Sequence, residues 1–234
     1  MINENDIVKE MLLKKISGEV VALEKPGQVL RKWRELMRIS QKDLAEKVGI
    51  SSSVISDYES GRRKSPGVGI IRRLVNGMIE LEMKRGGDII KEFSMETGSI
   101  INIILDLKEF VEPLRVSKFC RLIGAKLFYG DDKQPIYGYT IIDSIKAILN
   151  FSPNELVRIY GSTTSRALIF TKVSIGRSPM IAIKVTGLKP SLVVLHGVER
   201  PDELALKIAE IEDIPLAVVT KNIDQIINSL RKMD

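Results

Sequence analysis

Residues 41–66 read QKDLAEKVGISSSVISDYESGRRKSP, and this stretch limits the possible folds more than any other part of the chain. Apolar residues recur at helical spacing on both sides of Gly49: Leu44, Ala45, Val48, Val54, Ile55 and Tyr58. Ser40 followed by Asp43 is a capping-box pattern for a helix that begins at Gln41. Gly49 can adopt a positive φ without strain. The pattern predicts two short helices joined by a tight turn and followed by a basic loop.

The charge of the chain is concentrated around this stretch. The formal net charge is +6, and residues 26–85 hold 13 Lys/Arg against 7 Asp/Glu. This segment therefore carries the whole surplus, while basic and acidic residues balance in the remainder. A local basic surplus points to a polyanionic partner. One helix of a helix-turn-helix enters the DNA major groove while nearby cations meet the phosphates, so the sequence predicts double-stranded DNA as the partner.

Three groups of residues are candidates for DNA contact. Gln41 stands at a helix N-terminus, where its side chain and backbone N–H can meet a phosphate together. The predicted recognition helix offers its N-cap and its exposed polar face: Ser51, Ser52, Ser53, Ser56 and Asp57. Arg62, Arg63 and Lys64 follow that helix and are expected to bind the DNA backbone. Serine reads any base weakly and Asp57 accepts only from donors such as cytosine N4, so DNA shape is expected to add to specificity.

Each of these residues also has a structural interpretation. A run of cations alone is usually a solvated loop, and serines at a helix start can be an N-cap and its neighbours. Trp33 is a possible stacking residue, but it lies on the apolar face of a helix, which favours core packing.

The composition is that of a folded protein long enough for two domains. Of the 234 residues, 44% are hydrophobic and 28% charged. We expect a cytoplasmic protein, because no apolar run approaches about 20 residues, the N-terminus lacks a signal-peptide layout and Cys120 is the single cysteine. A lone cysteine with a lone histidine, His196, argues against a zinc site, and we expect no cofactor. Richness in Ile, Lys and Glu hints at a thermophilic source.

Pattern changes along the chain predict four segments. An amphipathic helix over about residues 3–16, broken at Gly18, opens the first segment, and further helices are expected from Pro26 and over residues 68–84. One or two amphipathic helices are expected after residue 88, ended or kinked at Pro113. The segments are an N-terminal helical extension, the helix-turn-helix domain, a helical linker or dimerisation segment and an α/β regulatory or dimerisation domain: residues 1–25, 26–85, 86–120 and 121–234.

The last segment has a mixed α/β pattern. Strands are expected over residues 125–129, 137–140, 155–160, 166–173, 180–185, 191–196 and 216–220. Helices are expected over residues 141–149, 201–211, with Pro201 as the first helical residue, and 223–232. Buried strands alternating with helices at the end of the chain predict a parallel, right-handed βαβ unit.

Residues 26–80 resemble the Xre or lambda-repressor-like helix-turn-helix family, which implies a five-helix DNA-binding domain. The matching residues are Gln41, Leu44, Ala45, Gly49, Ser51, Val54, Ile55, Tyr58, Glu59, Ser60, Gly61 and Pro66. The whole layout is similar to archaeal Xre-type regulators with an extra C-terminal domain, through the segments GEVVALEKPGQVLRKWRE, VISDYESGRRKSPG, IYGSTTSRALIFTKV and GRSPMIAIKV. In the family, an arginine of the first helix pairs with the glutamate that ends the recognition helix. Arg34 and Glu59 occupy those places, which implies a structural role for both.

The tail VVLHGVERPDELALKIAEIEDIPLAVVTKNIDQIINSL resembles the end of the non-catalytic N-terminal domain of HPr kinase and the related DRTGG domains. The resemblance implies an α/β fold without activity. The segment GSTTSR lacks the lysine and spacing of a Walker A loop, and a single histidine offers no catalytic triad. We therefore expect no enzyme.

The same GSTTSR segment has two interpretations. A glycine with hydroxyls and an arginine can form an anion nest at a strand end, which makes Ser162, Thr163, Thr164 and Arg166 candidates for a small anionic effector. A turn that joins two strands has the same composition. Arg177 is a second candidate anion contact. His196 ends a buried strand at a carboxyl edge, where α/β sheets place ligands, although a structural histidine is the more common case.

The leading hypothesis is a sequence-specific DNA-binding transcription regulator. One helix-turn-helix reads only a few base pairs, so we expect a homodimer held by residues 88–120 and the C-terminal domain. That domain is also the place for effector sensing. Two alternatives stay open: an adaptor, coactivator-like or antitoxin-like, whose main partner is a protein, and an α/β enzyme targeted by the N-terminal domain. The lack of a clustered acid, base or nucleophile stands against the enzyme.

Overall fold

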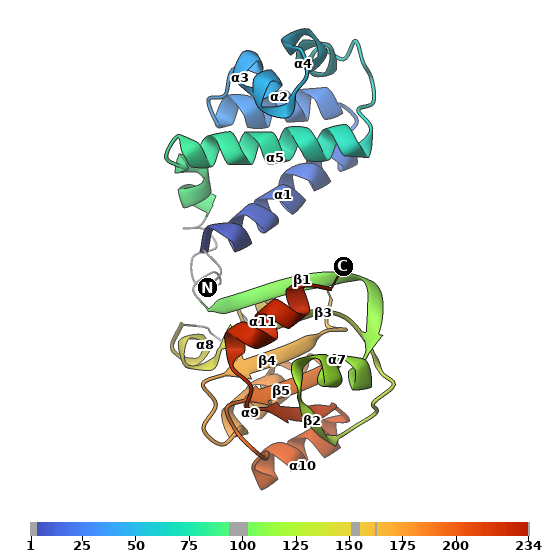
Figure 1. Ribbon diagram of the computed structural model, residues 1–234, viewed down its shortest axis with the longest axis vertical. Helices are drawn as coiled ribbons and strands as arrows, with labels where there is room; N and C mark the ends of the chain where they lie inside the picture. Colours follow the sequence, from blue (N-terminus) through green and yellow to red (C-terminus); the bar gives the residue numbers. More distant parts are fainter. Residues whose placement is uncertain (1–3, 94–102, 151–154, 162, 234) are drawn as a thin grey trace. The chain divides into compact units, whose positions relative to one another are not determined.

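The computed structural model describes residues 4–93, 103–150, 155–161 and 163–233 (Figure 1). The chain divides into two compact units, one within residues 3–98 and the other within residues 99–234. Within the described ranges, no helix combines the length and the apolar character that crossing a membrane requires.

The N-terminal unit is all-helical. Its helices are α1 (Glu4–Ala22), α2 (Pro26–Leu36), α3 (Gln41–Val48), α4 (Ser52–Glu59) and α5 (Val68–Lys84), and residues 88–93 are also helical. The start of α2 at Pro26 and the bounds of α3 and α5 agree with the sequence-based expectation. Long α5 supplies the centre of the core through Leu74, Val75, Met78 and Ile79, which are all buried.

Helix α1 continues through Gly18, where the sequence predicted a break. Ile16 and Val20 lie on either side of this glycine and are both buried, on the same helix face as buried Leu12 and Val8, one and two turns before Ile16. A glycine inside a helix costs only about 1 kcal/mol relative to alanine. Burial of the apolar stripe outweighs that cost, so the helix extends to Ala22.

The C-terminal unit contains a six-stranded mixed sheet with the order β1-β3-β4-β5-β6-β2. The strands are β1 (Ile104–Arg115), β2 (Lys126–Tyr129), β3 (Pro135–Asp143), β4 (Ala167–Thr171), β5 (Leu192–His196) and β6 (Leu216–Val219). Strands β3 to β6 are parallel, and β1 and β2 are antiparallel at the two edges. The α/β fold with parallel βαβ units is thereby confirmed.

Helices cover both faces of this sheet, which gives three layers (Figure 1). They are α7 (Val116–Ile123), α8 (Ser144–Asn150), the 3₁₀-helix η1 (Glu155–Tyr160), α9 (Arg177–Thr186), α10 (Glu203–Glu212) and α11 (Ile223–Arg231). One apolar core joins the sheet to buried residues of α8, η1, α9 and α10. A second core joins the opposite face to buried residues of α7 and α11.

The largest difference from the expected elements falls in the segment 86–120. Residues 104–115 form strand β1 and not a helix, and residues 94–102 lie outside the described residues. The strand forms because its backbone pairs with β3, from Ile104 opposite Ile142 to Arg115 opposite Pro135. Pro113 fits because β1 is an edge strand with an irregular register between Glu109 and Leu114. Long-range pairing overrides the helical periodicity.

Four smaller differences concern short apolar runs. Residues 155–160 form η1 and residues 180–185 lie in helix α9, although both were expected as strands. Periodicity alone cannot separate a short buried strand from a helix segment. Residues 141–143 extend β3, so the next helix begins only at Ser144. Helix α10 begins at Glu203 because the side chain of Asp202 accepts a hydrogen bond from the backbone N–H of Leu204, which leaves Pro201 outside the helix.

Candidate nucleic-acid interface

The turn between α3 and α4 is fixed by local geometry. The Ser40 hydroxyl accepts a hydrogen bond from the backbone N–H of Asp43 at 3.0 Å and caps α3. Gly49 ends that helix in the left-handed region, with φ 70° and ψ 42°. The guanidinium of Arg73 on α5 donates to the carbonyl oxygen of Val48. The two helices are therefore joined as the sequence pattern predicts.

A buried polar network sets the angle of α4. Arg34 forms a two-pronged ion pair with Glu59, with Nε–Oε1 at 2.6 Å and Nη2–Oε2 at 2.8 Å. The Arg34 guanidinium also donates to the Ile39 carbonyl at 2.7 Å, and the Gln41 amide donates to Glu59 Oε2 at 2.8 Å. The Glu59 carboxylate raises the pKa of Arg34. One network thus joins α2, α3 and α4, which confirms the internal pairing of Arg34 with Glu59.

Close backbone packing reinforces this arrangement. A Cβ atom added at Gly27 on α2 would lie 1.8 Å from the carbonyl oxygen of Tyr58 on α4. Only glycine allows this approach. Trp33 on the same helix is buried, and its indole N–H donates to Glu19 Oε2 at 2.8 Å, so it packs in the core as expected. Helix α4 is held rigidly, which a recognition helix requires.

The candidate residues on α4 divide into exposed and engaged groups. Ser51, Ser52 and Ser53 are exposed, whereas Ser56 and Asp57 are half-buried. Ser51 Oγ lies 2.8 Å from Ser53 Oγ. The N-terminal end of α4 therefore offers exposed hydroxyl groups for a base edge, and within it Ser51 and Ser53 contact each other.

Asp57 pairs with the basic loop. Its carboxylate lies 2.7 Å from Arg62 Nε and 3.7 Å from Arg63 Nε. The backbone N–H of Arg63 donates to the carbonyl of Asp57 at 3.0 Å, and the Arg63 guanidinium stands over the Tyr58 ring, 5.7 Å from its centroid. The sequence placed Asp57 on a base edge, whereas the geometry lets it orient two candidate phosphate ligands.

The start of α3 gathers further candidate groups. The Gln41 amide already donates to Glu59, so its expected phosphate contact falls mainly to the backbone N–H groups of the first helical turn. Lys42, which sequence reasoning missed, is exposed in that turn. A cation at the positive end of a helix dipole disfavours the helix, and a phosphate bound there would offset this repulsion.

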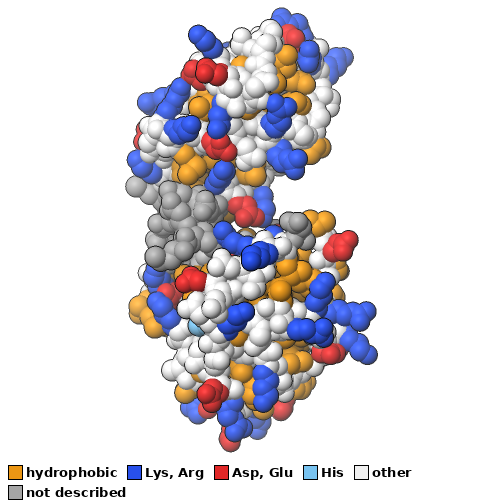
Figure 2. Space-filling view, viewed as in Figure 1, with side chains coloured by type: hydrophobic (Ala, Val, Ile, Leu, Met, Phe, Trp, Pro, Cys, Tyr) orange, Lys and Arg blue, Asp and Glu red, His pale blue; other side chains and the backbone are white. Residues whose placement is uncertain are grey.

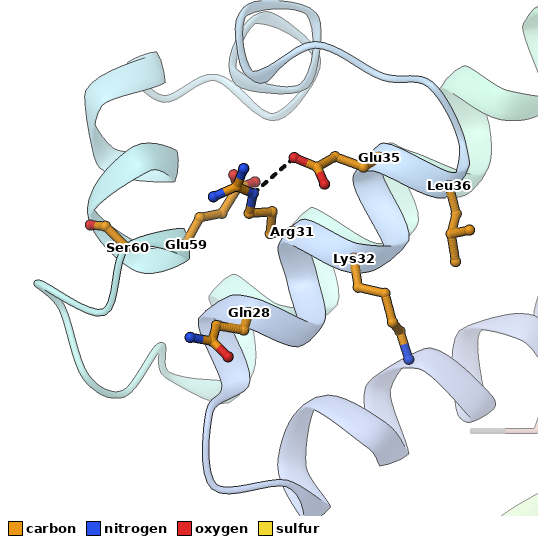
Figure 3. A pocket seen from close by; sticks show the side chains of 7 residues that line it. All are labelled: Gln28, Arg31, Lys32, Glu35, Leu36, Glu59 and Ser60. Carbon is orange, nitrogen blue, oxygen red and sulfur yellow. Dashed lines mark hydrogen bonds and ion pairs between the residues drawn. The ribbon is translucent and has the colours of Figure 1, made fainter.

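An open hollow of about 730 Å³ lies beside the C-terminal end of α4 (Figure 3). It is lined by Gln28, Arg31, Lys32, Glu35, Leu36, Glu59 and Ser60. Its charges are paired, with Arg31 Nε at 2.8 Å from Glu35 and Lys32 Nζ at 2.5 Å from Glu19. Small-molecule sites are mostly apolar and enclosed, so this shallow paired surface does not resemble one.

The candidate effector residues of the C-terminal unit do not converge. Ser162 lies outside the described residues, and Thr163 and Thr164 are half-buried. Arg166 is fully buried and donates to Glu109 at 2.9 Å and to the Tyr139 carbonyl at 3.1 Å. Its guanidinium points inward, and burial lowers its pKa. This arginine is therefore engaged by protein acceptors and not by the surface loop.

Arg177 and His196 have other partners. Arg177 forms a two-pronged ion pair with Asp202, with distances of 2.7 and 2.9 Å. His196 Nε2 lies 2.9 Å from the Lys221 carbonyl oxygen, which fits the structural interpretation of this histidine.

These features define a helix-turn-helix DNA-binding protein, and comparison with known sequences agrees. The sequence model of the helix-turn-helix family matches residues 30–78. A protein of Archaeoglobus fulgidus named as an HTH-type transcriptional regulator is 49% identical over 220 residues, which cover 93% of this chain and 95% of the relative. One of Methanocaldococcus jannaschii with the same description is 44% identical over 223 residues, covering 93% and 92%. No solved structure gives a significant match.

The chain therefore belongs to the family of HTH-type transcriptional regulators, with an Xre-like helix-turn-helix followed by an α/β region. Membership implies DNA binding. Both relatives come from thermophilic archaea, in line with the composition.

Proposed function

We propose that this protein binds double-stranded DNA sequence-specifically as a homodimer and regulates transcription from the bound site. The observation that carries the proposal is the rigid placement of α4. The Arg34–Glu59–Gln41 network fixes the helix, and Arg62, Arg63 and Lys64 follow its C-terminal end on the surface. A rigid helix with a polar exposed end and adjacent cations fits major-groove docking.

Base reading and backbone binding are divided between different groups. Ser52 and Ser53 reach base edges, but their short hydroxyls discriminate weakly. Arg62, Arg63 and Lys64, together with the start of α3, neutralise phosphates and fix the register. Discrimination then depends on DNA deformability and on the spacing of two copies.

The α/β region serves association and, in our proposal, sensing. It carries no expected catalytic group, so we assign it no reaction and no cofactor, and we expect the protein to act in the cytoplasm. A small anionic effector remains a proposal for the loop around Thr163 and Thr164. Arg166 and Arg177 contribute to such a site only if Glu109 and Asp202 release them.

The test is selection of bound duplexes from genomic DNA, followed by binding measured against salt. In an Arg62→Ala/Arg63→Ala variant, a dimer loses four phosphate contacts, so the slope of log affinity against log salt falls by about 3 to 4. Arg31→Ala is the matched control, because Arg31 is an exposed, ion-paired arginine of the same unit. Unchanged binding by the double variant would refute the role of the loop. Capture of a protein partner without any salt-sensitive duplex binding would favour the adaptor alternative.

A further inference from the structure

The two helical layers of the C-terminal unit have different outer surfaces. The described part of this unit exposes eleven large apolar side chains, and nine belong to the layer of α8, η1, α9 and α10 or its connecting loop. These are Ile145, Ile148, Leu149, Val157, Ile175, Ile181, Val185, Leu204 and Ile211. Among the described residues, α7 and α11 on the other face contribute none of the eleven. Part of the apolar layer is visible over α8 in Figure 2.

The exposed side chains form stripes on two neighbouring helices. On α8, Ile145, Ile148 and Leu149 follow the i, i+3, i+4 spacing of one helix face. On α9, Ile181 and Val185 follow the i, i+4 spacing, while Met180 and Ile183 face the core. Helix α9 is thus apolar on two faces, although only one of them packs against the sheet. A surface helix with a single partner normally has one apolar face.

A small cavity of about 60 Å³ lies between these two helices. Its lining is mainly apolar and comes from α8, α9 and Phe170 of the sheet: Ser144, Ala147, Ile148, Phe170, Ser178, Pro179 and Ala182. Ser144 is buried, and its hydroxyl has no hydrogen-bond partner among the residues that the structure describes. Helices α8 and α9 therefore flank one apolar groove, which Ile148 of the α8 stripe lines directly and which Pro179 and Ala182 line from α9.

The charges at the two ends of α9 are paired within the layer. At the two ends of α9, Arg177 pairs with Asp202 and Lys184 Nζ lies 3.0 Å from Glu212. The intervening residues 178–183 are uncharged. In a two-fold contact, each group near the axis faces its own copy, so an unpaired charge there would repel itself. On α9, an uncharged centre with paired charges at its ends suits contact with an identical helix.

We propose that the α8–α9 surface is the contact between two copies of this chain. The inference rests on the proposed function, because two helix-turn-helix units must be related by symmetry to read a two-part DNA site. Burying one Ile or Leu side chain removes roughly 60–120 Å² of apolar area, so the five exposed side chains of α8 and α9 supply on the order of 200–350 Å² per copy, to which their apolar neighbours on η1 and α10 add. A standard interface takes about 800 Å² per partner, of which roughly 65% is apolar in homodimers. The available area is of the right order.

This surface replaces the expected contact through residues 88–120. In that segment residues 88–93 are helical, residues 104–115 form edge strand β1 and α7 begins at Val116. On β1, Val111 is 92% exposed but Phe110 and Leu114 are buried. An irregular register and Pro113 interrupt its free edge, and both features disfavour pairing with a second strand.

The test uses the full chain with Leu149→Glu and Val185→Glu together, which places carboxylates opposite their own copies. These side chains are 76% and 65% exposed, so the fold tolerates the change. Sedimentation velocity at micromolar concentration should show a wild-type dimer and at least 100-fold weaker self-association of the variant. The control, Val111→Glu, changes an exposed apolar residue of the same unit outside the layer and should remain dimeric. A Leu149→Lys/Val185→Lys variant mixed with the Glu variant should restore a dimer.

A monomeric wild type, a Glu variant that stays dimeric or a mixture that stays monomeric would each overturn the proposal. Circular dichroism and thermal unfolding check that every variant is folded. If a charged variant does not fold, Leu149→Ser/Val185→Ser takes its place and is expected to weaken the dimer about tenfold. DNA binding is scored separately. The Glu variant should keep wild-type affinity for a half-site duplex and lose the tighter binding to a two-part site. If the wild type binds no duplex, the proposed function fails, while sedimentation still decides the α8–α9 contact.

Discussion

The two units use their arginines in opposite ways. In the N-terminal unit, Arg62 and Arg63 lie on the surface and are held by the half-buried carboxylate of Asp57. In the C-terminal unit, Arg166 is fully buried and engaged by Glu109 and backbone carbonyls. In both units the arginines come directly after a short segment of glycine and hydroxyl residues, a composition that is typical of anion-binding loops. The difference shows that an arginine near serines and a glycine indicates an anion site only where the guanidinium reaches the surface.

The largest predicted effects compare the buried arginine of each unit. Arg34→Ala removes the guanidinium that neutralises the buried Glu59 carboxylate, and Arg166→Ala removes a buried guanidinium that donates to Glu109 and to the Tyr139 carbonyl. Removing one partner of a buried pair costs about 3–5 kcal/mol of unfolding free energy. Trp33 is the single tryptophan and lies in the N-terminal unit, so its fluorescence in urea reports on that unit. Arg34→Ala should shift the fluorescence transition, and Arg166→Ala should shift mainly the circular dichroism signal of the α/β unit.

An exposed pair provides the control for this comparison. Arg31 and Glu35 form an i, i+4 pair on the surface of α2. Such pairs contribute only about 0.3–0.5 kcal/mol, so Arg31→Ala should leave both transitions almost unchanged. A loss below about 1 kcal/mol for Arg34→Ala would contradict the structural role assigned to the Arg34–Glu59 pair.

Cys120 supplies a matching probe for the C-terminal unit. Burial raises the pKa of its thiol to about 11, and the side chain is 5% exposed. At pH 8, labelling of the native protein by a thiol reagent should be at least 100-fold slower than in urea, because the reactive thiolate is scarce and covered. Since the folded pKa is above the unfolded value, its contribution to stability is present below about pH 9 and is lost as the pH rises toward 11. Rapid labelling without unfolding would contradict the buried position of Cys120 on α7.

The sequence predicted the elements that depend on neighbouring residues and missed those that depend on residues far apart in the chain. Ser40, Gly49 and Pro26 act on their own helix ends, and the structure has those ends where they were expected. Strand β1 depends on pairing with β3, as between Ile104 and Ile142, and no local pattern contains that information. Helix α9 resembled a strand because apolar residues of two faces alternate in its sequence. Because a strand was expected over residues 180–185, the sequence did not reveal the second apolar face of α9, on which the proposed dimer contact rests.

In the candidate DNA site, too, the sequence predicted the features that depend on local position and missed those that depend on the folded chain. The exposed serines and basic loop follow from position along the helix, so sequence reasoning found them. The pairing of Asp57 with Arg62 depends on how the chain folds back after Gly61 and could not be predicted. Lys42 was not predicted, because an exposed lysine in a first helical turn indicates DNA contact only when a phosphate is already expected at that helix end.

A smaller effect on DNA binding distinguishes two roles of Asp57, orienting the arginines of the basic loop and contacting a base edge. Asp57→Asn removes a negative charge beside the DNA, so we expect affinity for random duplexes to rise a few-fold and discrimination against them to fall about tenfold. If Asp57 acts through the arginines, the substitution should have no further effect on discrimination in an Arg62→Ala/Arg63→Ala background. Lys64→Ala, which removes a neighbouring cation, should leave the effect of Asp57→Asn intact. A changed preference at one base pair would instead assign Asp57 to a base edge.

The smallest predicted effect compares the two serines that precede α3 and α4. Ser40 Oγ accepts the Asp43 N–H, whereas Ser51 Oγ is engaged with Ser53 Oγ and, within the described chain, makes no side-chain cap to α4. Loss of a hydrogen-bonded cap costs about 1 kcal/mol, so Ser40→Ala should lower the unfolding free energy by about that amount and Ser51→Ala by less than about 0.5 kcal/mol. Trp33 fluorescence in urea measures both. If Ser51 contributes to DNA binding, its substitution should weaken duplex binding without the stability loss of Ser40→Ala. Equal stability losses would show that Ser51 caps α4 in solution, which would return it to a structural role.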